Sequence, residues 1–554
     1  MKGPSVLDAL GISFVMLLAV VASAFAVRVL PVAVPVPLVQ IVMGALIAGV
    51  FGRGVELDPE LFFVLFLPPL LFLDGWRIPK DGLLRDRATI VELAFGLVFF
   101  TVLGLGALIH WMIPAIPWAV AFALAAIVSP TDPVAVSAIT ARVSMPGRVM
   151  HILEGESLLN DASGLVAFRF AVAAAVTGSF SLASAAASFV WVSVAGLAIG
   201  AAFTWLVFAA RDWFSRRYGE EPGSQILLSL LVPFGAYELA EAAHASGILA
   251  AVSAGVAMSY VELSGRAMAA TRVQRAAVWN TVQFALNGIM FVLLGEQLPD
   301  IFRGALQVVE ETGHQNPWWL LAYALAINLV LAALRFVWVW VSLQISQRLA
   351  IRRGRQAPQP SWRMLAAVSL AGVRGAITLA GVLTLPMLVA DGSPFPAREL
   401  AIFLAATVII VSLVTASVAL PRLLDGLAVP PETAHHAQED LARKAARRAG
   451  VIAIEAKRSK LVETNPDVDP QLYSDIAGRL VESFAMQGGA AATADAQPEA
   501  QLRQKQEAIA RAMHFAALNA SRDELFRLAR AREISDEVCR KAVRNLDLQE
   551  ARLR

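Results

Sequence analysis

The sequence has one cysteine, Cys539, and few charged residues for a chain of its length. A single cysteine excludes an intramolecular disulfide framework and a thiolate metal site. Charged residues make up 16% of the 554 positions, whereas soluble domains carry about 25%, so the composition excludes an ordinary soluble protein. The sequence also shows no histidine cluster for a metal and no glycine-rich phosphate loop after a strand pattern. We therefore predict no enzymatic activity, no cofactor and no nucleic-acid partner.

Long apolar runs occupy the first three quarters of the chain instead. Because about 20 apolar residues cross a bilayer, we predict an all-α polytopic membrane protein with about 13 transmembrane helices. The candidate spans are residues 6–27, 36–52, 59–75, 89–112, 118–139, 149–176, 184–209, 224–242, 246–262, 279–298, 317–344, 363–388 and 399–421. The first run is too long for the core of a signal peptide and many spans follow it, so we interpret it as a retained helix.

Lysine and arginine are concentrated in alternate loops. The loop at 211–217 is rich in arginine, for example, whereas the intervening loops hold only Arg53, Arg303 and Arg398. Because basic loops stay in the cytoplasm, we predict an external N-terminus and a cytoplasmic C-terminus. The alanine- and arginine-rich usage is typical of a bacterial inner membrane protein.

The composition changes near Arg422 to charged and alanine-rich. We therefore assign residues 1–425 to a transmembrane domain and residues 426–554 to a cytoplasmic helical tail. The tail is either a simply solvated segment or a regulatory, dimer-stabilising one.

A polar motif interrupts one of the apolar segments. Residues 155–161, with the sequence GESLLND, lie inside the span 149–176. Ionisable groups at membrane depth are costly, so they indicate a function or a partner. Four residues recur at three- and four-residue spacing and therefore share one helix face: Ser157, Asn160, Asp161 and Gly164. That face offers hard oxygen ligands for a small cation, and its carboxylate can bind a proton instead.

Two predicted spans are interrupted near their middle. The first contains Ser129–Pro133, where two prolines remove backbone donors and prevent a regular helix. Irregular backbone at membrane depth is tolerated only where it lines a cavity or packs against protein. The second contains Ala371–Ala376, where two glycines flank Arg374. Its guanidinium must be paired at this depth, and Glu156 and Asp132 are the candidate partners.

The two breaks fall in the fifth and the twelfth predicted spans. Their spacing fits two inverted six-span repeats joined by the seventh span. Broken segments at corresponding positions of two halves indicate the binding site of a secondary transporter. A simple proline kink would not need Asp132 at the same depth, so we favour an unwound site.

Other polar residues are open to more than one interpretation. Asp74 ends the third span and faces either the site or the membrane interface beside Arg77. We assign no role to Glu296 or Arg169. Four further residues are expected to be interfacial or cavity-lining: Glu92, Glu238, Glu241 and Arg335.

Four ordered motifs resemble those of the monovalent cation/proton antiporter family. They are FLPPLLFLDGW from Phe66, SPTDPVAV from Ser129, GESLLND from Gly155 and GVRGAI from Gly372. The chain is most similar to the bacterial NhaP-like sodium/proton exchanger branch with a long cytoplasmic tail. The resemblance implies a homodimer with a dimerisation domain and a core domain that moves in an elevator-like way. It also implies that two unwound helices cross near the ion site.

The resemblance implies roles at the ion site. Asp161 would be the exchanging carboxylate, and Ser157 and Thr131 would complete the shell of the bound cation. Relatives with two adjacent aspartates tend to be electrogenic, whereas an Asn-Asp pair such as Asn160-Asp161 resembles the electroneutral group. The physical argument agrees, because one carboxylate that exchanges one cation for one proton moves no net charge.

Supporting roles are implied for four other residues. Asp132 would stabilise the crossed helices, and Glu156 would form a structural ion pair with Arg374. Asp74 falls where related proteins have an acidic residue near the site.

We therefore predict a secondary transporter that exchanges a monovalent cation, sodium first, for protons by alternating access. The cation and the proton are its substrates, and membrane lipid and a second copy of the chain are its partners. The alternatives are potassium/proton antiport by the same fold and a non-transporting membrane sensor. An organic-solute carrier is disfavoured because small apolar residues surround the breaks, and saturable coupled flux would exclude a pore.

Overall fold

The computed structural model of the chain describes most of its first 425 residues. The described ranges are 6–30, 34–51, 59–78, 86–140, 145–178, 182–219, 221–263, 269–311, 318–352, 361–389 and 392–425, with a few single positions between 458 and 478. The chain divides into two compact units, Met1–Val429 and Pro430–Arg554. The tail predicted at 426–554 lies almost wholly outside the described residues, and so does Cys539.

The named elements of the first unit are all helices in the described ranges. They are α1 Val6–Val29, α2 Val36–Phe51, α3 Pro59–Arg77, α5 Arg87–Val91, the π-helix η1 Glu92–Leu97, α6 Val98–Met112, α7 Trp118–Val128, α8 Pro133–Thr140, α9 Gly147–Thr177, α10 Leu182–Tyr218, α11 Pro222–Ala242, α12 Gly247–Leu263, α13 Ala269–Glu311, α14 Trp318–Arg352, α15 Trp362–Leu370, α16 Ala376–Leu383 and α17 Arg398–Leu424. Among the described residues, an isolated antiparallel β-bridge joins Leu388 and Pro394.

The helices confirm the predicted all-α membrane fold. Each predicted span contains a helix or consecutive helices. Among the described residues, seven helical segments are long and apolar enough to cross a membrane, and four shorter apolar helices accompany them. The two spans predicted to be broken form the helix pairs α7–α8 and α15–α16.

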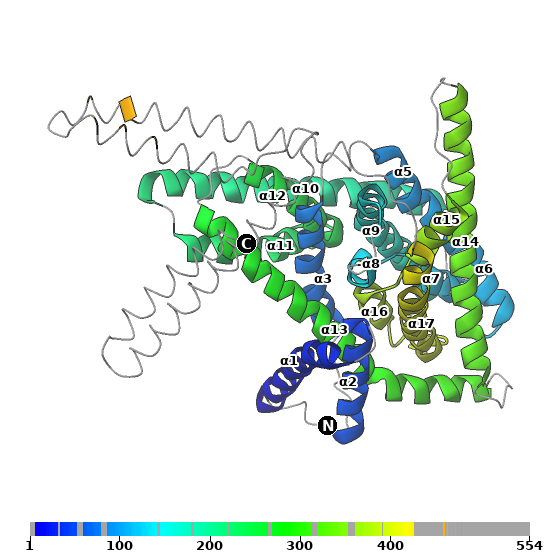
Figure 1. The fold of residues 1–554 in the computed structure, drawn as a ribbon. Coiled ribbons are helices and arrows are strands. Elements are labelled where there is room, and N and C mark those ends of the chain that lie inside the picture. Colours follow the sequence, from blue (N-terminus) through cyan, green and yellow to red (C-terminus); the bar gives the residue numbers. More distant parts are fainter. Residues whose placement is uncertain are drawn as a thin grey trace. The chain divides into compact units, whose positions relative to one another are not determined.

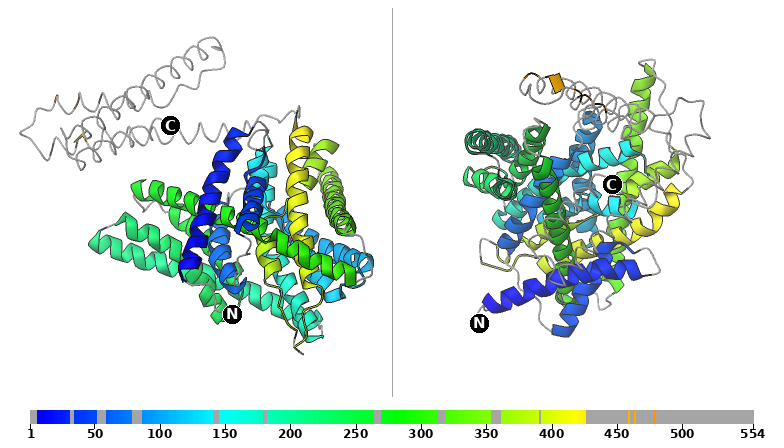
Figure 2. Two further views of the ribbon diagram at one scale, coloured as in Figure 1. Left: turned by 90° about the horizontal axis from the view of Figure 1, so that it is seen from below. Right: turned by 60° about the vertical axis from the view of Figure 1, so that its left-hand side comes forward.

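The helices pack as two groups (Figure 1). The scaffold group, as we call it, consists of α1, α2, α3 and α10–α13, in which α2 packs on α13 and α12 packs on both α3 and α10. The core group consists of α5–α9 and α14–α17, in which α7 packs on both α6 and α9. The further views keep the yellow α17 beside the yellow-green α14 and α15 (Figure 2). The two groups meet where α13 contacts α17 and where α3 contacts α9 and α16.

Two helix pairs of the scaffold group approach backbone to backbone. Gly44 of α2 and Gly295 of α13 each face the other helix, and so do Gly75 of α3 and Gly255 of α12. A Cβ at any of these four positions would overlap a backbone carbonyl oxygen of the facing helix. Small residues allow this close approach, which is a common way to pack helices in a membrane.

Candidate functional site

The two broken helices of the core group meet at their breaks. The backbone N–H of Asp132 donates a hydrogen bond to the carbonyl oxygen of Val373, with an N···O distance of 2.7 Å. Gly375 lies against the carboxylate of Asp132, which a Cβ at that position would overlap. Pro130 and Pro133 lack N–H donors, so the first helix cannot continue through them, and Pro133 can only begin a new one. The predicted crossing of broken helices is therefore present.

Arg374 lies at the C-terminal ends of the half-helices α7 and α15, and Asp132 lies at the N-terminal ends of α8 and α16. Nε of Arg374 donates to the carbonyl oxygen of Val128 at 2.8 Å, and Nη1 donates to the carbonyl oxygen of Gly372. These carbonyl groups lie at the C-terminal ends of α7 and α15, where the helix dipole is negative. Asp132 lies where α8 begins and beside Gly375, where α16 begins, at the positive ends. The Asp–Arg arrangement therefore compensates the dipoles of both broken helices.

The predicted polar face of α9 lies against the first break. Ser157, Asn160 and Asp161 are all buried. Nδ2 of Asn160 donates to Oγ1 of Thr131 at 3.1 Å and to Oε1 of Glu156 at 3.4 Å. Oδ1 of Asn160 is buried without a hydrogen-bond partner among the described residues. Since buried acceptors are normally satisfied, this oxygen is available to a cation.

The close approach of α9 to the break depends on Gly164. A Cβ there would come within 2.9 Å of Cδ of Pro130 and 3.0 Å of the carbonyl oxygen of Ala126. The missing side chain lets the break approach α9. It thereby places Thr131 within reach of Asn160.

Asp161 is the carboxylate of this face without a fixed partner. Its side chain is 4% exposed, and no hydrogen bond or ion pair joins it to the described part of the chain. It lies close enough to Asp74, Asp132 and Glu156 for their charges to interact. An ionised carboxylate buried in this way is unfavourable until a cation or a proton neutralises it.

The partner predicted for Glu156 is wrong. Glu156 forms a bidentate ion pair with Arg335 of α14, with N···O distances of 2.5 and 2.6 Å, and not with Arg374. Both side chains of the pair are buried, and Nε of Arg335 also donates to the carbonyl oxygen of Val368. Arg374 lies near enough to Glu156 for their charges to interact, but its own donors are used by the helix-end carbonyl groups.

Asp74 lies on the scaffold side of the site. It is half-buried near the end of α3, and its charge interacts with those of Asp132 and Asp161. The guanidinium of Arg77 donates to Asn280 and Gln283 of α13. Asp74 therefore lies within electrostatic reach of the core group, while Arg77 is held within the scaffold group.

Sequence reasoning missed several polar contacts of the core group. Oγ of Ser163 donates to the carbonyl oxygen of Ala94 in η1 at 2.6 Å, and Oγ of Ser342 donates to Oε2 of Glu92 at 2.9 Å. Glu92 and Arg335 are charged residues within apolar segments. This feature of the sequence could have indicated that each of them has a polar partner. Nothing in the residue pattern indicates the π-helix, which shifts the carbonyl groups that Ser163 meets.

These features define a class of protein. Crossed broken helices with compensated ends, beside a buried carboxylate on a third helix, are the apparatus of a secondary transporter. The sequence matches the family described as sodium/hydrogen exchanger, transmembrane, over residues 15–426. The chain belongs to the sodium/hydrogen exchanger family.

Named relatives agree with this assignment. The chain is 40% identical to the Na(+)/H(+) exchanger YjcE of Escherichia coli over 542 residues, 97% of this chain and 98% of the relative. It is 43% identical to the sodium, potassium, lithium and rubidium/H(+) antiporter of Bacillus pumilus over 85% of this chain and 69% of the relative. The fold is similar to that of the sodium proton antiporter MjNhaP1 from Methanocaldococcus jannaschii, with a TM-score of 0.56 and 18% identity over 76% of this chain and 99% of that one.

Family membership confirms the main functional prediction. The chain is a multi-pass membrane protein and an antiporter of monovalent cations and protons. It is accordingly a transporter and not an enzyme, as the sequence predicts.

Proposed function

We propose that this antiporter exchanges sodium for protons, one for one, at Asp161 by alternating access. The observation that carries the proposal is the isolation of this carboxylate: it is buried beside the crossing and has no partner among the described residues. Two of the neighbouring acids, Glu156 and Asp132, are already compensated. Glu156 is paired with Arg335, and Asp132 lies at two helix N-termini.

The residues around Asp161 support a shared site for the cation. Oδ1 of Asn160 is an unused buried acceptor, and the hydroxyl oxygens of Ser157 and Thr131 belong to the same face and the same break. Oxygen ligands of this kind suit a hard monovalent cation. Protonation of Asp161 neutralises the carboxylate and releases the cation. An empty, ionised Asp161 cannot cross the low-dielectric barrier, and this prohibition couples the two fluxes.

Electroneutral exchange follows from the single unpaired carboxylate on the polar face of α9. Asn160 carries no charge in any state, and the charge of Glu156 is balanced by Arg335. The cycle therefore replaces one cation by one proton at Asp161 and carries the same charge in both directions.

A second candidate is antiport of potassium and other monovalent cations. It is favoured by the Bacillus pumilus relative, whose name includes potassium, lithium and rubidium. The side chains at the site are the same for either ion, since selectivity depends on ligand distances and the flexibility of the site. We place sodium first and leave the comparison of cations to the flux experiment below.

The first prediction concerns flux through proteoliposomes. Sodium, lithium, potassium or rubidium is added while an internal dye reports pH and valinomycin with potassium sets the voltage. We expect a saturable sodium-driven pH change that is independent of voltage in the wild-type protein and absent from Asp161→Asn. The matched control is Asp300→Asn on α13, because Asp300 is an exposed carboxylate paired with Arg303.

Any of three results would contradict the proposal. Sodium-driven proton movement in Asp161→Asn would remove Asp161 from the exchange site. A larger signal from potassium than from sodium, with the same loss in the mutant, would establish the second candidate. Absence of flux with every cation would favour the non-transporting sensor.

The arrangement of the protein in the membrane is part of the same proposal. We expect a homodimer formed through the scaffold group, with the core group as the moving part, in a bacterial inner membrane. The N-terminus would lie outside, and the tail from residue 426 would lie in the cytoplasm with a regulatory role. The concentration of arginine at one end of α10, in Arg211, Arg216 and Arg217, supports this orientation.

A further inference from the structure

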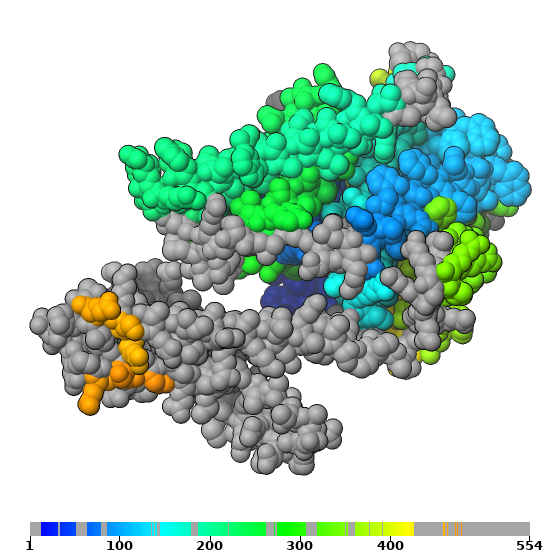
Figure 3. Space-filling model, turned by 90° about the horizontal axis from the view of Figure 1, so that it is seen from above, coloured from blue at the N-terminus to red at the C-terminus, as the bar shows by residue number. Residues whose placement is uncertain are grey.

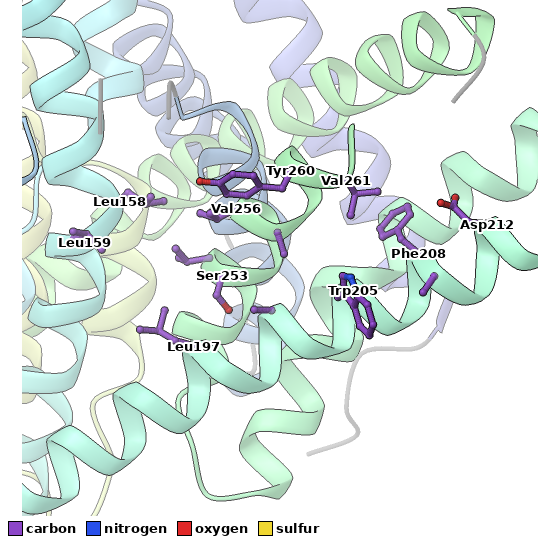
Figure 4. A pocket seen from close by; sticks show the side chains of 14 residues that line it. Leu158, Leu159, Leu197, Trp205, Phe208, Asp212, Ser253, Val256, Tyr260 and Val261 are labelled. Atoms are coloured by element: carbon purple, nitrogen blue, oxygen red, sulfur yellow. The ribbon is translucent and has the colours of Figure 1, made fainter. Parts of the chain in front are cut away.

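A deep apolar crevice lies between the two helix groups, outside the ion site. It has a volume of about 910 Å³ and is lined by Leu158 and Leu159 of α9, by one face of α10 and by one face of α12. Figure 4 shows the lining side chains, which run from Leu158, Leu159 and Leu197 at one end to Phe208 and Asp212 at the other. Its walls therefore belong to the core group on one side and to the scaffold group on the other.

The crevice has the length and polarity of one lipid leaflet. From Leu197 to Asp212, α10 rises about 22 Å at 1.5 Å per residue, compared with the roughly 15 Å of hydrocarbon in half a bilayer plus its polar boundary. The lining is almost wholly aliphatic and aromatic. The carboxylate of Asp212 lies at one end, whereas the hydroxyls of Ser253 and Tyr260 lie along the length of the crevice. A slot that is apolar over most of its length and carries a charged group at one end matches an acyl chain.

Arginine outnumbers aspartate at the polar end of the crevice. Arg211, next to the rim, packs over the ring of Phe208 with its Cζ 5.6 Å from the ring centroid, and its Nε pairs with Asp212 at 3.7 Å. Arg216 and Arg217 follow within two turns on α10 and are exposed. Arginine next to an acyl slot is complementary to the phosphate of an anionic phospholipid.

Aromatic side chains mark the same end of α10 as a membrane boundary. Trp213, Phe214 and Tyr218 are all largely exposed there. Exposed aromatic residues beside arginine are typical of the level of the lipid head groups. The space-filling view shows α10 along the surface of the first unit (Figure 3), so lipid in the surrounding membrane has direct access to this helix.

We propose that the crevice binds an anionic phospholipid, with one acyl chain between α9, α10 and α12 and its phosphate against the arginines of α10. Lipid tails are as apolar as these walls, so burial alone gives little preference. The preference for this lipid comes from two sources. The acyl chain packs closely against side chains that would lack contacts in an empty crevice, and the charged head group binds the arginines. The acyl chain touches Leu158 and Leu159, which lie between Ser157 and Asn160 in sequence, so its presence biases the position of the core group.

The test uses a phosphatidylglycerol that carries a photoreactive diazirine in one acyl chain, with purified full-length protein in liposomes. We expect photolabelling of the α10 segment 197–212 and the α12 segment 252–261, and suppression of that labelling by excess unlabelled phosphatidylglycerol but not by phosphatidylcholine. Equal competition by both lipids, or labelling spread evenly over the exposed apolar helices, would overturn the proposal. This competition needs no variant and no transport.

Two variants with a matched control extend the test. Ala201→Phe and Ala257→Phe each place a ring in the crevice, whereas Val194→Phe adds one on an exposed part of α10 that does not line it. We expect at least a five-fold loss of crevice labelling in either filled variant and none in Val194→Phe. Unchanged labelling in both filled variants would overturn the proposal. Because the readout is lipid binding, it stands apart from the ion-exchange proposal, which fails or succeeds in the flux experiment.

Discussion

Residues near the crossing differ in what neutralises their charge. Glu156 and Arg335 neutralise each other in a buried bidentate pair, and Arg374 and Asp132 are each placed at helix ends of opposite sign. Asp161 alone of these residues has neither a counter-charge nor a hydrogen bond in the described part of the chain. The paired groups hold the site in shape, and in the proposed function the remaining carboxylate, Asp161, exchanges its partner.

The buried pair should respond strongly to the loss of either partner. We expect Arg335→Gln to lower the free energy of unfolding by about 3–5 kcal/mol, because it leaves Glu156 buried without a counter-charge. The double variant Glu156→Gln, Arg335→Gln should lose less than the two single losses added together. Thermal unfolding of purified protein in detergent measures both effects.

The matched control for this prediction is Arg303→Gln. Arg303 pairs with Asp300 at the surface, with both side chains more than half exposed, so its loss should cost at most about 1 kcal/mol. If Arg335→Gln proved as mild as Arg303→Gln, the pair with Glu156 would have no structural role.

Gly164 should be intolerant of the smallest side chain. In Gly164→Ala the new methyl group meets the ring of Pro130 and a backbone carbonyl group, neither of which is a flexible chain end. We expect a loss of about 1–3 kcal/mol in stability from overpacking, and a higher KM for sodium because Thr131 is pushed away from Asn160.

Gly49→Ala provides the comparison for this substitution. A Cβ at Gly49 of α2 meets nothing within 4 Å, so alanine there should be neutral or slightly stabilising. Equal sodium KM values for the two variants would show that the approach at Pro130 does not shape the site.

At the scale of elements, an ion pair joins the core group and the scaffold group. Arg169 near the end of α9 donates through both Nη1 and Nη2 to Oε1 of Glu241 on α11, at 3.3 Å each. The same oxygen accepts from the backbone N–H of Gly247, at the start of α12. A displacement of the core group along the scaffold group must break this contact, so it favours the arrangement seen here.

Arg169→Gln should therefore change the balance between conformations by a small factor. The pair is partly exposed, and such pairs contribute at most about 1 kcal/mol, so turnover should change by less than about five-fold at physiological salt. The effect should fade at high salt, and the charge-swapped double variant Arg169→Glu, Glu241→Arg should recover the wild-type rate. A loss of all transport in Arg169→Gln would instead place Arg169 in the ion pathway.

The breaks in the helices were predictable from the sequence, but the partners of long side chains were not. Two prolines or two glycines at membrane depth leave no regular alternative, so the positions of both breaks follow from local chemistry. Arg374 and Arg335 lie on neighbouring elements, and each has a flexible stem of several bonds. Which of them reaches Glu156 depends on the packing of α14 against α15, and sequence spacing does not determine that packing. The π-helix η1 was not predictable from the sequence either, and it packs against α9.

At the scale of the whole molecule, the orientation of the chain in the membrane has a direct test. Cys539 is the sole cysteine of the sequence and lies in the tail. We expect a membrane-impermeant maleimide to label it in inverted vesicles and not in intact cells, because the proposed orientation places the basic loops and the tail in the cytoplasm. Full labelling after solubilisation in denaturant is the control for access to the thiol. Labelling in intact cells would reverse the orientation.

The glycine contacts of the scaffold group have a mechanical consequence. In α2–α13 and in α3–α12, backbone rests on backbone at four glycines. A slip of one turn, about 5.4 Å along the helix axis, would bring the side chain of another residue to the place where only a hydrogen atom fits. The two helices of each pair therefore resist sliding along each other and behave as one rigid unit. We therefore expect any strain that arises when the ion changes to be relieved at the boundary between the two helix groups and not inside these helix pairs.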